Sequence, residues 1–410
     1  MNKATGKIQV FEHNTLYHGR EYKGVLFKEQ HFNLLAKLNQ YHDNKYFTLV
    51  HKGIKFSQYV GVIQVDGLCI EILPKIDNSE EDTQLWQGVL INMLKATKRL
   101  KVNNIGHANV NKQNIHLLDI YFEWFLNEVQ SLIHQGLIKK YYKETGNVKA
   151  LKGKLEFAQH LNANLIHKER FFTTHQIYNK DHLVHQILGV ALEIISQFSR
   201  GTYIYAKCKT VQLDFPEVTS TQVNQATFTK LPKSRKTKPY ETALEIARLI
   251  ILNFAPNISS GSEKMLALLF DMNSLWEEYV LVRLRQAATE GVIVYGQNYK
   301  PFWNNITIRP DIVITKGDDT FVIDTKWKNI NGSKPSTNDL RQMYVYNEYW
   351  KSNNSILLYP APETKSPNFI SYYGDDMHRC AIGKLNILNY RGLNENVGYE
   401  ILEWFENSVN

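Results

Sequence analysis

The chain has 410 residues, 43% of them hydrophobic and 12% aromatic, so it can bury sizeable cores and has the length of about two to three domains. Its formal net charge of +8 permits a polyanionic partner such as nucleic acid. The three cysteines form no CxxC pair, which excludes a zinc ribbon and a disulfide framework. No apolar stretch suits a signal segment or a membrane span, which excludes membrane insertion. Together these features predict a cytoplasmic protein.

The first hundred residues predict mostly strands. In YVGVIQVDGLCIEILPKI, residues 59–76, two apolar runs flank the Asp-Gly dipeptide at 66–67, which favours a two-residue hairpin turn. Such a turn fixes the strand register and places Glu71 on the face opposite the paired isoleucines. With a helix expected over roughly 81–97, these patterns predict a β-rich N-terminal domain over residues 1–110.

The middle of the chain predicts helices. Apolar side chains recur every three and four residues over 115–133, and further helices are expected over 180–199 and from 241 onward. The segment 229–239 is rich in Lys and Arg, has two prolines and lacks an apolar period, so it predicts an exposed basic loop that is either simply solvated or a DNA contact. We therefore expect a helical middle segment over 111–240.

The C-terminal part alternates between helices and strands. This alternation predicts a mixed α/β domain over residues 241–410, in a chain that is α+β overall. The expected elements are a helix over 272–289, a strand over 292–295, a hairpin over 309–330, a helix over 338–350, a strand over 355–359 and a strand-rich end.

The hairpin RPDIVITKGDDTFVIDTKWKNI, residues 309–330, carries charges where apolar side chains are expected. A turn at 317–318 puts Asp311 opposite Asp324, and alternation along the strand places Asp324 and Lys326 on one face. Two close carboxylates repel unless a cation lies between them, so this pattern predicts Mg²⁺ held by the two aspartates. The lysine would then orient or deprotonate the attacking water and stabilise negative charge. A surface hairpin with an incidental ion pair is the alternative.

This arrangement resembles the core of PD-(D/E)xK nucleases. Residues 310–311 supply the "PD" and residues 324–326 supply the "DxK". The resemblance implies a restriction-endonuclease-like mixed sheet flanked by helices, which hydrolyses DNA with the help of Mg²⁺.

Two neighbouring segments extend that resemblance. In NDLRQMYVYNEYW, Gln342 and Tyr346 lie four apart on one helix face and resemble the QxxxY element of RecB-like nucleases, which implies that both face the substrate side of the site. In SLWEEYV, Glu277 lies on a helix where the superfamily often places a further carboxylate, although a surface salt bridge explains it equally well. Its neighbour Glu278 is expected to face solvent.

The order of motifs along the chain resembles that of McrC proteins, the nuclease subunits of McrBC modification-dependent restriction systems. The resemblance covers roughly residues 50–360. Two positions depart from the family pattern, since Trp276 and Trp327 stand where the family usually has Phe and Tyr, but both keep an aromatic ring. The segments that carry the resemblance are YVGVIQVDGLCIEILPKI, LIHQGLIKKYYKE, LKGKLEF, MNSLWEEYV, RPDIVI, VIDTKWK and DLRQMYVYNEY.

The resemblance to McrC implies a partner. McrC-like subunits cut double-stranded DNA together with a McrB-like AAA+ GTPase ring, which translocates on DNA and recognises methylcytosine. In the family the N-terminal domain, here residues 1–110, docks on the ring and stimulates GTP hydrolysis. The chain itself has no GxxxxGK(S/T) motif, so we expect it to bind no nucleotide.

Three other interpretations remain open. The first is a nuclease subunit of a McrBC-like system that cuts unmethylated sites, and the second is a non-catalytic regulator of an AAA+ ring, against which the intact site residues argue. The third is a zinc site at His182 and His185, three apart on a helix, with His175 nearby. It would need further confirmed ligands, so ordinary surface histidines are the expectation.

Overall fold

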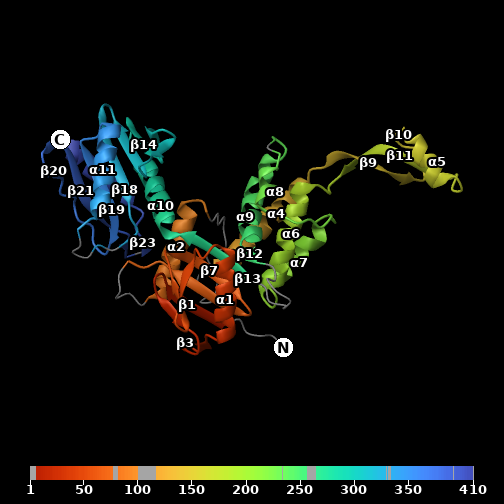
Figure 1. Cartoon of the computed structure of the whole chain (residues 1–410), viewed down its shortest axis with the longest axis horizontal. Helices are drawn as coiled ribbons and strands as arrows, with labels where there is room; N and C mark the ends of the chain where they lie inside the picture. The colour runs from red at the N-terminus through yellow and green to blue at the C-terminus, as the bar shows by residue number, and fades with distance from the viewer. Residues whose placement is uncertain are drawn as a thin grey trace. The chain divides into compact units, whose positions relative to one another are not determined.

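The computed structural model describes residues 6–76, 82–99, 117–232, 234–255, 265–328, 330, 334–390 and 392–409. The chain divides into two compact units (Figure 1). A helical unit comprises residues 114–256, and a sheet unit combines residues 3–113 with residues 257–410. In the described residues no helix is long and apolar enough to cross a membrane.

The first sheet of the sheet unit joins N-terminal strands to a strand that begins at Met265. The predicted hairpin is confirmed, because Val65 pairs with Leu68 and Gly61 with Ile72 around a turn in which Asp66 adopts φ 40°. A strand roughly two hundred residues later then pairs antiparallel with the same hairpin. The strand order within this unit is β1 (Gly6–Phe11), β8 (Leu68–Leu73), β7 (Tyr59–Val65) and β13 (Met265–Asp271), with β1 parallel to β8.

Smaller elements complete the N-terminal part of the sheet unit. The expected helix over 81–97 is confirmed as α2 (Thr83–Ala96), and Asp82 caps it by accepting hydrogen bonds from the backbone N–H groups of Gln84 and Leu85. The other elements are β2 (Thr15–Tyr17), β3 (Glu21–Tyr22), β4 (Val25–Leu26), α1 (Glu29–Tyr41), β5 (Phe47–Val50) and β6 (Gly53–Phe56).

A second, six-stranded sheet carries the charged hairpin. The strand order is β14 (Val292–Gly296), β17 (Ile312–Lys316), β18 (Asp319–Thr325), β19 (Asn354–Ala361), β21 (Asp375–Asn386) and β20 (Ile370–Tyr372). Neighbouring strands are antiparallel from β14 to β18, parallel from β18 to β21, and antiparallel between β21 and β20. The sheet is therefore mixed, and the predicted α+β class is confirmed.

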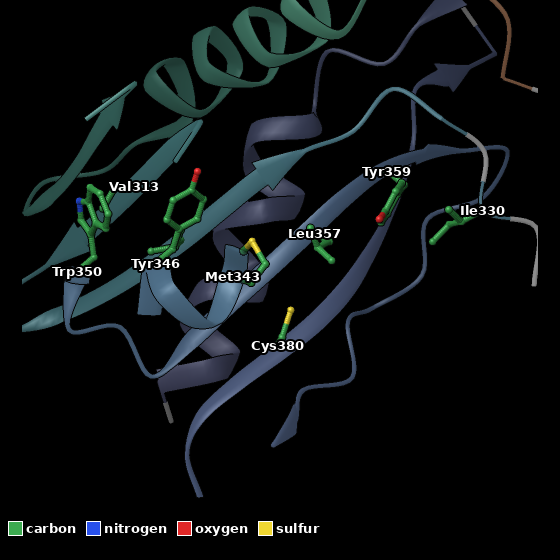
Figure 2. Packing of buried hydrophobic residues seen from close by; sticks show 9 residues of the cluster. Val313, Ile330, Met343, Tyr346, Trp350, Leu357, Tyr359 and Cys380 are labelled. Atoms are coloured by element: carbon green, nitrogen blue, oxygen red, sulfur yellow. The ribbon is translucent and has the colours of Figure 1, made fainter. Parts of the chain in front are cut away.

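Helix α11 (Thr337–Trp350) connects β18 to the parallel strand β19 and covers one face of this sheet. Figure 2 shows Met343, Tyr346 and Trp350 of the helix packed with Val313 and Leu357 of the strands. Its N-terminus is capped by a Ser336 side chain, as expected for a helix that follows a loop. The helix therefore holds any polar side chain on its inner face against the end of β18.

Helices α10 (Met272–Ala287) and α12 (Val397–Val409) pack against each other, and α12 contributes Phe405, whose ring lies 5.6 Å from that of Phe321 in β18. The expectation of a strand-rich end is wrong for α12. Val397, Ile401 and Phe405 are buried at a spacing of four, which is the helical period that sequence reasoning missed. The remaining short strands are β15 (Lys300–Trp303), β16 (Ile306–Ile308), β22 (Leu388–Asn389) and β23 (Gly392–Leu393).

The helical unit confirms the helices expected in the middle of the chain. Its last long helix, α9, packs on α4 and α6, so residues 241–252 belong to this unit. The expected division of the chain at residues 110 and 240 stays a prediction about independent folding. The elements are α4 (Leu117–Gln135), β9 (Lys140–Val148), β10 (Lys154–Leu155), α5 (Phe157–Asn164), β11 (Phe171–Asn179), α6 (Leu183–Phe198), α7 (Tyr203–Asp214), α8 (Gln225–Thr229), the 3-10 turn η1 (Lys238–Tyr240), α9 (Glu241–Leu252) and β12 (Phe254–Ala255).

The basic segment 229–239 contains an anchored turn. Arg235 and Lys236 are exposed, as predicted, whereas Thr237 is buried and its hydroxyl donates to the carbonyl of Pro232 at 2.9 Å. Lys233 lies outside the described residues. A DNA contact by this segment stays a prediction.

Candidate active site

The two aspartates of the hairpin face each other because of the strand register. Around the turn at 317–318, Ile312 pairs with Ile323, so the next position outward on each strand places Asp311 opposite Asp324. This is the register that the two-residue turn predicts. Asp324 shares a strand face with Val322, which lies in the cluster under α11. The site therefore lies at the end of the hairpin, beneath α11.

Asp324 is a buried carboxylate with an incomplete set of partners. Its side chain is 2% exposed, Oδ2 lies 2.7 Å from Nζ of Lys326, and Oδ1 accepts a hydrogen bond of 3.3 Å from Nε2 of Gln342. Burial and then the charge of Asp311 raise the pKa of Asp324 to about 6. The attraction of Lys326 only partly offsets these two effects. The carboxylates of Asp311 and Asp324 thus both act on one ammonium.

Lys326 completes this pair from the same strand face. Burial on its own lowers the pKa of the ammonium, but the carboxylates of Asp324, Asp311 and Asp339 outweigh that effect and raise the pKa above its usual value. The side chain is 25% exposed, so the ammonium can contact Asp324 and still reach solvent.

Asp311 is oriented by the residue between Asp324 and Lys326. Its Oδ2 accepts hydrogen bonds from the backbone N–H of Thr325 at 2.7 Å and from the Thr325 hydroxyl at 2.8 Å. Thr325 points away from the face that carries Asp324, and it is buried. The middle residue of the DxK motif thus holds the other carboxylate in place, a role that sequence reasoning did not assign.

Gln342 and Tyr346 lie where the QxxxY resemblance implies. Besides its contact with Asp324, Gln342 Nε2 donates to the Tyr346 hydroxyl at 2.7 Å. The Tyr346 hydroxyl donates in turn to the carbonyl of Arg309 at 2.8 Å, and the ring is buried in the cluster of Figure 2. The chain of hydrogen bonds ties α11 to both strands of the hairpin and fixes the amide of Gln342 over Asp324.

Glu277 and Glu278 of α10 differ in their surroundings. Glu277 accepts a hydrogen bond of 2.9 Å from Gln297, and burial together with the charge of Asp311 raises its pKa to about 7. It therefore lies on the Asp311 side of the site. Glu278 is 39% exposed and pairs with Arg99 at 2.6 Å, so the expectation that it faces solvent holds only in part.

The carboxylates present suit a magnesium ion. Among the described residues, the one polar contact of Asp324 Oδ2 is the ammonium of Lys326 at 2.7 Å. Within the described ranges, no three His, Cys, Asp or Glu side chains lie close enough to hold a metal between them. Mg²⁺ is commonly held by one or two carboxylates, with waters and substrate phosphates filling the other positions. Asp311 and Asp324 fit that requirement, and the ion would be shared with the substrate.

The histidines of α6 have structural roles. His185 is fully buried, so the expectation of a surface histidine is wrong for this residue. Its Nδ1 lies 2.6 Å from the carbonyl of Lys180 and its Nε2 lies 3.3 Å from the Tyr240 hydroxyl, while His182 Nε2 contacts the carbonyl of Ile138 at 3.1 Å. Burial lowers the pKa of His185 to about 4. Neutral, hydrogen-bonded imidazoles of this kind stabilise a core.

A buried glutamate from the N-terminal sheet reaches the strand that carries the site. Glu12, 1% exposed, accepts a hydrogen bond of 2.6 Å from the indole of Trp327, which directly follows Lys326. The indole of Trp327 also lies 5.7 Å from that of Trp276. The two tryptophans that depart from the McrC pattern therefore contact each other. Sequence reasoning missed Glu12 because no motif marks a partner 315 positions away.

Comparisons with known proteins identify the family. A family model described as "McrBC 5-methylcytosine restriction system component" matches residues 54–360. The Type IV methyl-directed restriction enzyme EcoKMcrBC of Escherichia coli (strain K12) is 22% identical over 293 residues, which cover 65% of this chain and 83% of the relative.

Solved structures share the fold. A chain in an assembly of Thermococcus gammatolerans McrB AAA+ hexamers with bound McrC superposes with a TM-score of 0.71 at 19% identity, over 98% of this chain and 99% of that one. A second Thermococcus gammatolerans McrBC complex gives a TM-score of 0.51 at 18% identity, over 68% of this chain and 88% of that one. Since the matching family model spans well over half of the sequence, the expected resemblance is confirmed, and the chain belongs to the McrBC family of 5-methylcytosine restriction system components.

Proposed function

We propose that the chain is the Mg²⁺-dependent endodeoxyribonuclease subunit of a McrBC-type restriction complex, which cuts foreign double-stranded DNA in the cytoplasm. One observation carries the proposal. Asp324 is buried, and its two contacts are the ammonium of Lys326 at 2.7 Å and the amide of Gln342 at 3.3 Å, so the neighbouring carboxylates of Asp311 and Asp324 lie beside a single ammonium. Such an arrangement suits a cation shared with a phosphodiester.

In the proposed mechanism, Asp311 and Asp324 would hold a Mg²⁺ ion, which would supply Lewis-acid activation of the phosphate and of water. Thr325 keeps Asp311 oriented through its two hydrogen bonds. The ammonium of Lys326, which contacts Asp324 and reaches solvent, donates to a phosphate oxygen on which negative charge develops and orients the attacking water.

Three further residues of the proposed site act around this pair. Gln342 holds Asp324 by a hydrogen bond, and Tyr346 fixes Gln342 relative to the hairpin. Glu277, held by Gln297 on the Asp311 side, contributes a further carboxylate that accepts a proton or binds a water near the ion. A residue that only positions another group is expected to lower the cleavage rate less than loss of Asp324.

We further propose that the partner is a McrB-like AAA+ GTPase ring, whose GTP hydrolysis this chain stimulates. The assembly of AAA+ hexamers with bound McrC from Thermococcus gammatolerans supports this role. The resemblance assigns docking to residues 1–110. The structure adds a second candidate surface in the helical unit, because exposed apolar side chains lie on α5, directly after it and in the β9–β10 loop, and exposed apolar side chains often mark interaction sites. They are Leu151, Phe157, Leu161, Leu165 and Ile166.

Two charge-introducing variants separate these docking surfaces. Leu161→Asp tests the surface on α5, and Leu49→Asp, at an exposed position of β5, is its counterpart in the N-terminal region. The measurement is GTP turnover by the partner ring in the presence of each variant. We expect Leu161→Asp to abolish the stimulation. If Leu49→Asp abolishes it while Leu161→Asp does not, docking belongs to residues 1–110.

Cleavage assays with the partner, GTP and Mg²⁺ on methylated and unmethylated plasmids test the proposed function. We expect the wild type to cut methylated DNA and Asp324→Asn to cut neither substrate. Glu278→Gln, the next residue of α10, which is paired with Arg99, serves as the matched control and should cut normally. Cleavage restricted to unmethylated DNA would support the alternative specificity. GTPase stimulation without cleavage by the wild type would identify a non-catalytic regulator.

A further inference from the structure

An open cavity of about 810 Å³ adjoins the candidate active site. It lies between α11 and the β15–β16 segment, and Gln342 and Tyr346 belong both to its wall and to the site. Because Gln342 contacts Asp324, a ligand in this cavity lies next to the atoms that would bind the cleaved phosphate. The mechanism proposed above uses none of the cavity's other lining residues.

Aromatic rings line the outer wall of this cavity. Tyr299 is 70% exposed and Phe302 is 44% exposed, and the Phe302 ring lies 5.5 Å from that of Tyr349 at the outer end of α11. Large exposed rings are costly in water, so several of them around one cavity indicate a ligand with a flat apolar face. Nucleobases have such a face, and stacking on aromatic side chains tolerates any base.

Two arginines line the same cavity. Neither Arg309 nor Arg341 forms an ion pair with a carboxylate in the part of the chain that the structure describes. Arg309 donates instead to the side-chain oxygen of Gln297 at 3.2 Å. Guanidinium groups bind phosphate through paired hydrogen bonds. The wall thus offers stacking surfaces and phosphate donors together.

These properties favour an unpaired strand over a duplex. In an intact duplex both faces of each base are covered by neighbouring pairs, so only an unstacked base can lie against Tyr299 and Phe302. We propose that this cavity binds an unstacked nucleotide of the DNA strand that is cut, with its base on the two rings and its phosphate on the two arginines. This inference rests on the proposed nuclease function and adds that the substrate at the site is locally unpaired DNA.

The test is binding of full-length chain to DNA containing 2-aminopurine, in the absence of divalent cations so that nothing is cut. One duplex is fully paired, and a matched duplex places the fluorescent base in a three-nucleotide bulge. We expect tighter binding to the bulged duplex, with quenching of the 2-aminopurine fluorescence by stacking. Phe302→Ala and Tyr299→Ala should each weaken binding to bulged DNA by about tenfold and change binding to paired DNA little.

Two further variants control this experiment. Trp303→Ala removes a 69% exposed ring from the same strand as Phe302, but Trp303 does not line the cavity, so bulge binding should be unchanged. Arg341→Ala should weaken binding to both duplexes and reduce its salt dependence. Equal affinity of the wild type for bulged and paired DNA, or the same loss in Trp303→Ala as in Phe302→Ala, would overturn the inference.

The outcomes distinguish failure of the cavity proposal from failure of the proposed nuclease function. Cleavage that disappears in Asp324→Asn, together with bulge binding that is insensitive to Phe302 and Tyr299, would reject the cavity and keep the nuclease. Undiminished cleavage by Asp324→Asn would reject the nuclease site itself, and the inference with it.

Discussion

Glu71 in β8 and Asp324 in β18 are two buried carboxylates with opposite surroundings. Their side chains are 1% and 2% exposed, and each lies within hydrogen-bond distance of a lysine, Lys7 at 2.9 Å and Lys326 at 2.7 Å. Glu71 also accepts hydrogen bonds on both oxygens from Gln87. Apart from its lysine, Asp324 accepts one hydrogen bond, from Gln342 at 3.3 Å, and it lies near the carboxylate of Asp311.

This comparison shows what separates a structural charge from a functional one. A buried charge is stable where paired groups satisfy all of its oxygens, as for Glu71. Where a second carboxylate stands opposite and one ammonium serves both, the group favours an additional cation, as for Asp324. Burial and a lysine partner are common to both residues, so only the unbalanced charge distinguishes the site.

The largest expected effect comes from Asp324→Asn. The amide keeps the shape but loses the charge that a hard cation requires, and metal catalysis is worth several kcal/mol. Cleavage with the partner, GTP and Mg²⁺ should therefore fall by at least about a hundredfold. Circular dichroism should match the wild type, which shows that the fold is intact. Near wild-type cleavage by this variant would break the distinction between the two carboxylates.

Lys326→Ala should also lower the cleavage rate by about a hundredfold, because it removes the ammonium that stabilises negative charge on the phosphate. Metal binding should survive, since both carboxylates remain. Gel-based cleavage rates and a metal titration on the same preparation check the two statements. A variant that keeps cutting at the wild-type rate would show that Lys326 only neutralises Asp324.

Glu71→Ala should affect stability and leave cleavage alone. It removes the acceptor of Gln87 and Lys7, which are only partly exposed, and loss of hydrogen bonds to a charged group costs about 1.5–3 kcal/mol. Thermal unfolding of the full chain should shift to lower temperature, while the cleavage rate measured well below the transition should be unchanged. Loss of cleavage without loss of stability would assign a functional role to Glu71 and remove the contrast.

Glu12, a third buried carboxyl, should give the smallest effect. Burial raises its pKa to about 8, against 4.5 for the free group, although the hydrogen bond from Trp327 opposes this shift. Between pH 4.5 and about 8 the folded chain binds more protons at Glu12 than the unfolded chain. The stability that protonated Glu12 contributes is therefore complete below pH 4.5 and is lost as the pH rises through about 8.

The corresponding measurement is the melting temperature from pH 6 to pH 9. The Glu12→Gln side chain can still accept a hydrogen bond from the Trp327 indole but has no proton to lose. Its melting temperature should therefore change with pH by a few degrees less than that of the wild type, since 1 kcal/mol corresponds to about 2–4 °C. A wild type and a variant with the same pH dependence would show that Glu12 does not titrate in this range.

Local sequence signals predicted the parts of the fold that depend on local geometry. The Asp-Gly turn fixed the register of β7 and β8, and the Gly-Asp turn placed Asp311 opposite Asp324. The spacing of Gln342 and Tyr346 placed both side chains toward the hairpin because helix periodicity is also local.

Contacts between distant segments could not be predicted in this way. No pattern in the first fifty residues indicates that Glu12 reaches Trp327, or that β13 pairs with β7. These contacts depend on tertiary packing, and residues that meet in this way have no characteristic spacing in the sequence. Helix α12 is different, because its apolar period was present at Val397, Ile401 and Phe405 and was overlooked.

Binding of Mn²⁺ to the full-length chain, followed by electron paramagnetic resonance, tests the central claim most directly. Mn²⁺ binds oxygen ligands as Mg²⁺ does, and the measurement needs neither the partner nor DNA. The account predicts that the wild type and Glu71→Gln bind the ion alike and that Asp324→Asn binds it at least about tenfold more weakly. Equal binding by Asp324→Asn and the wild type would contradict the claim that unbalanced charge at Asp311 and Asp324 forms the metal site.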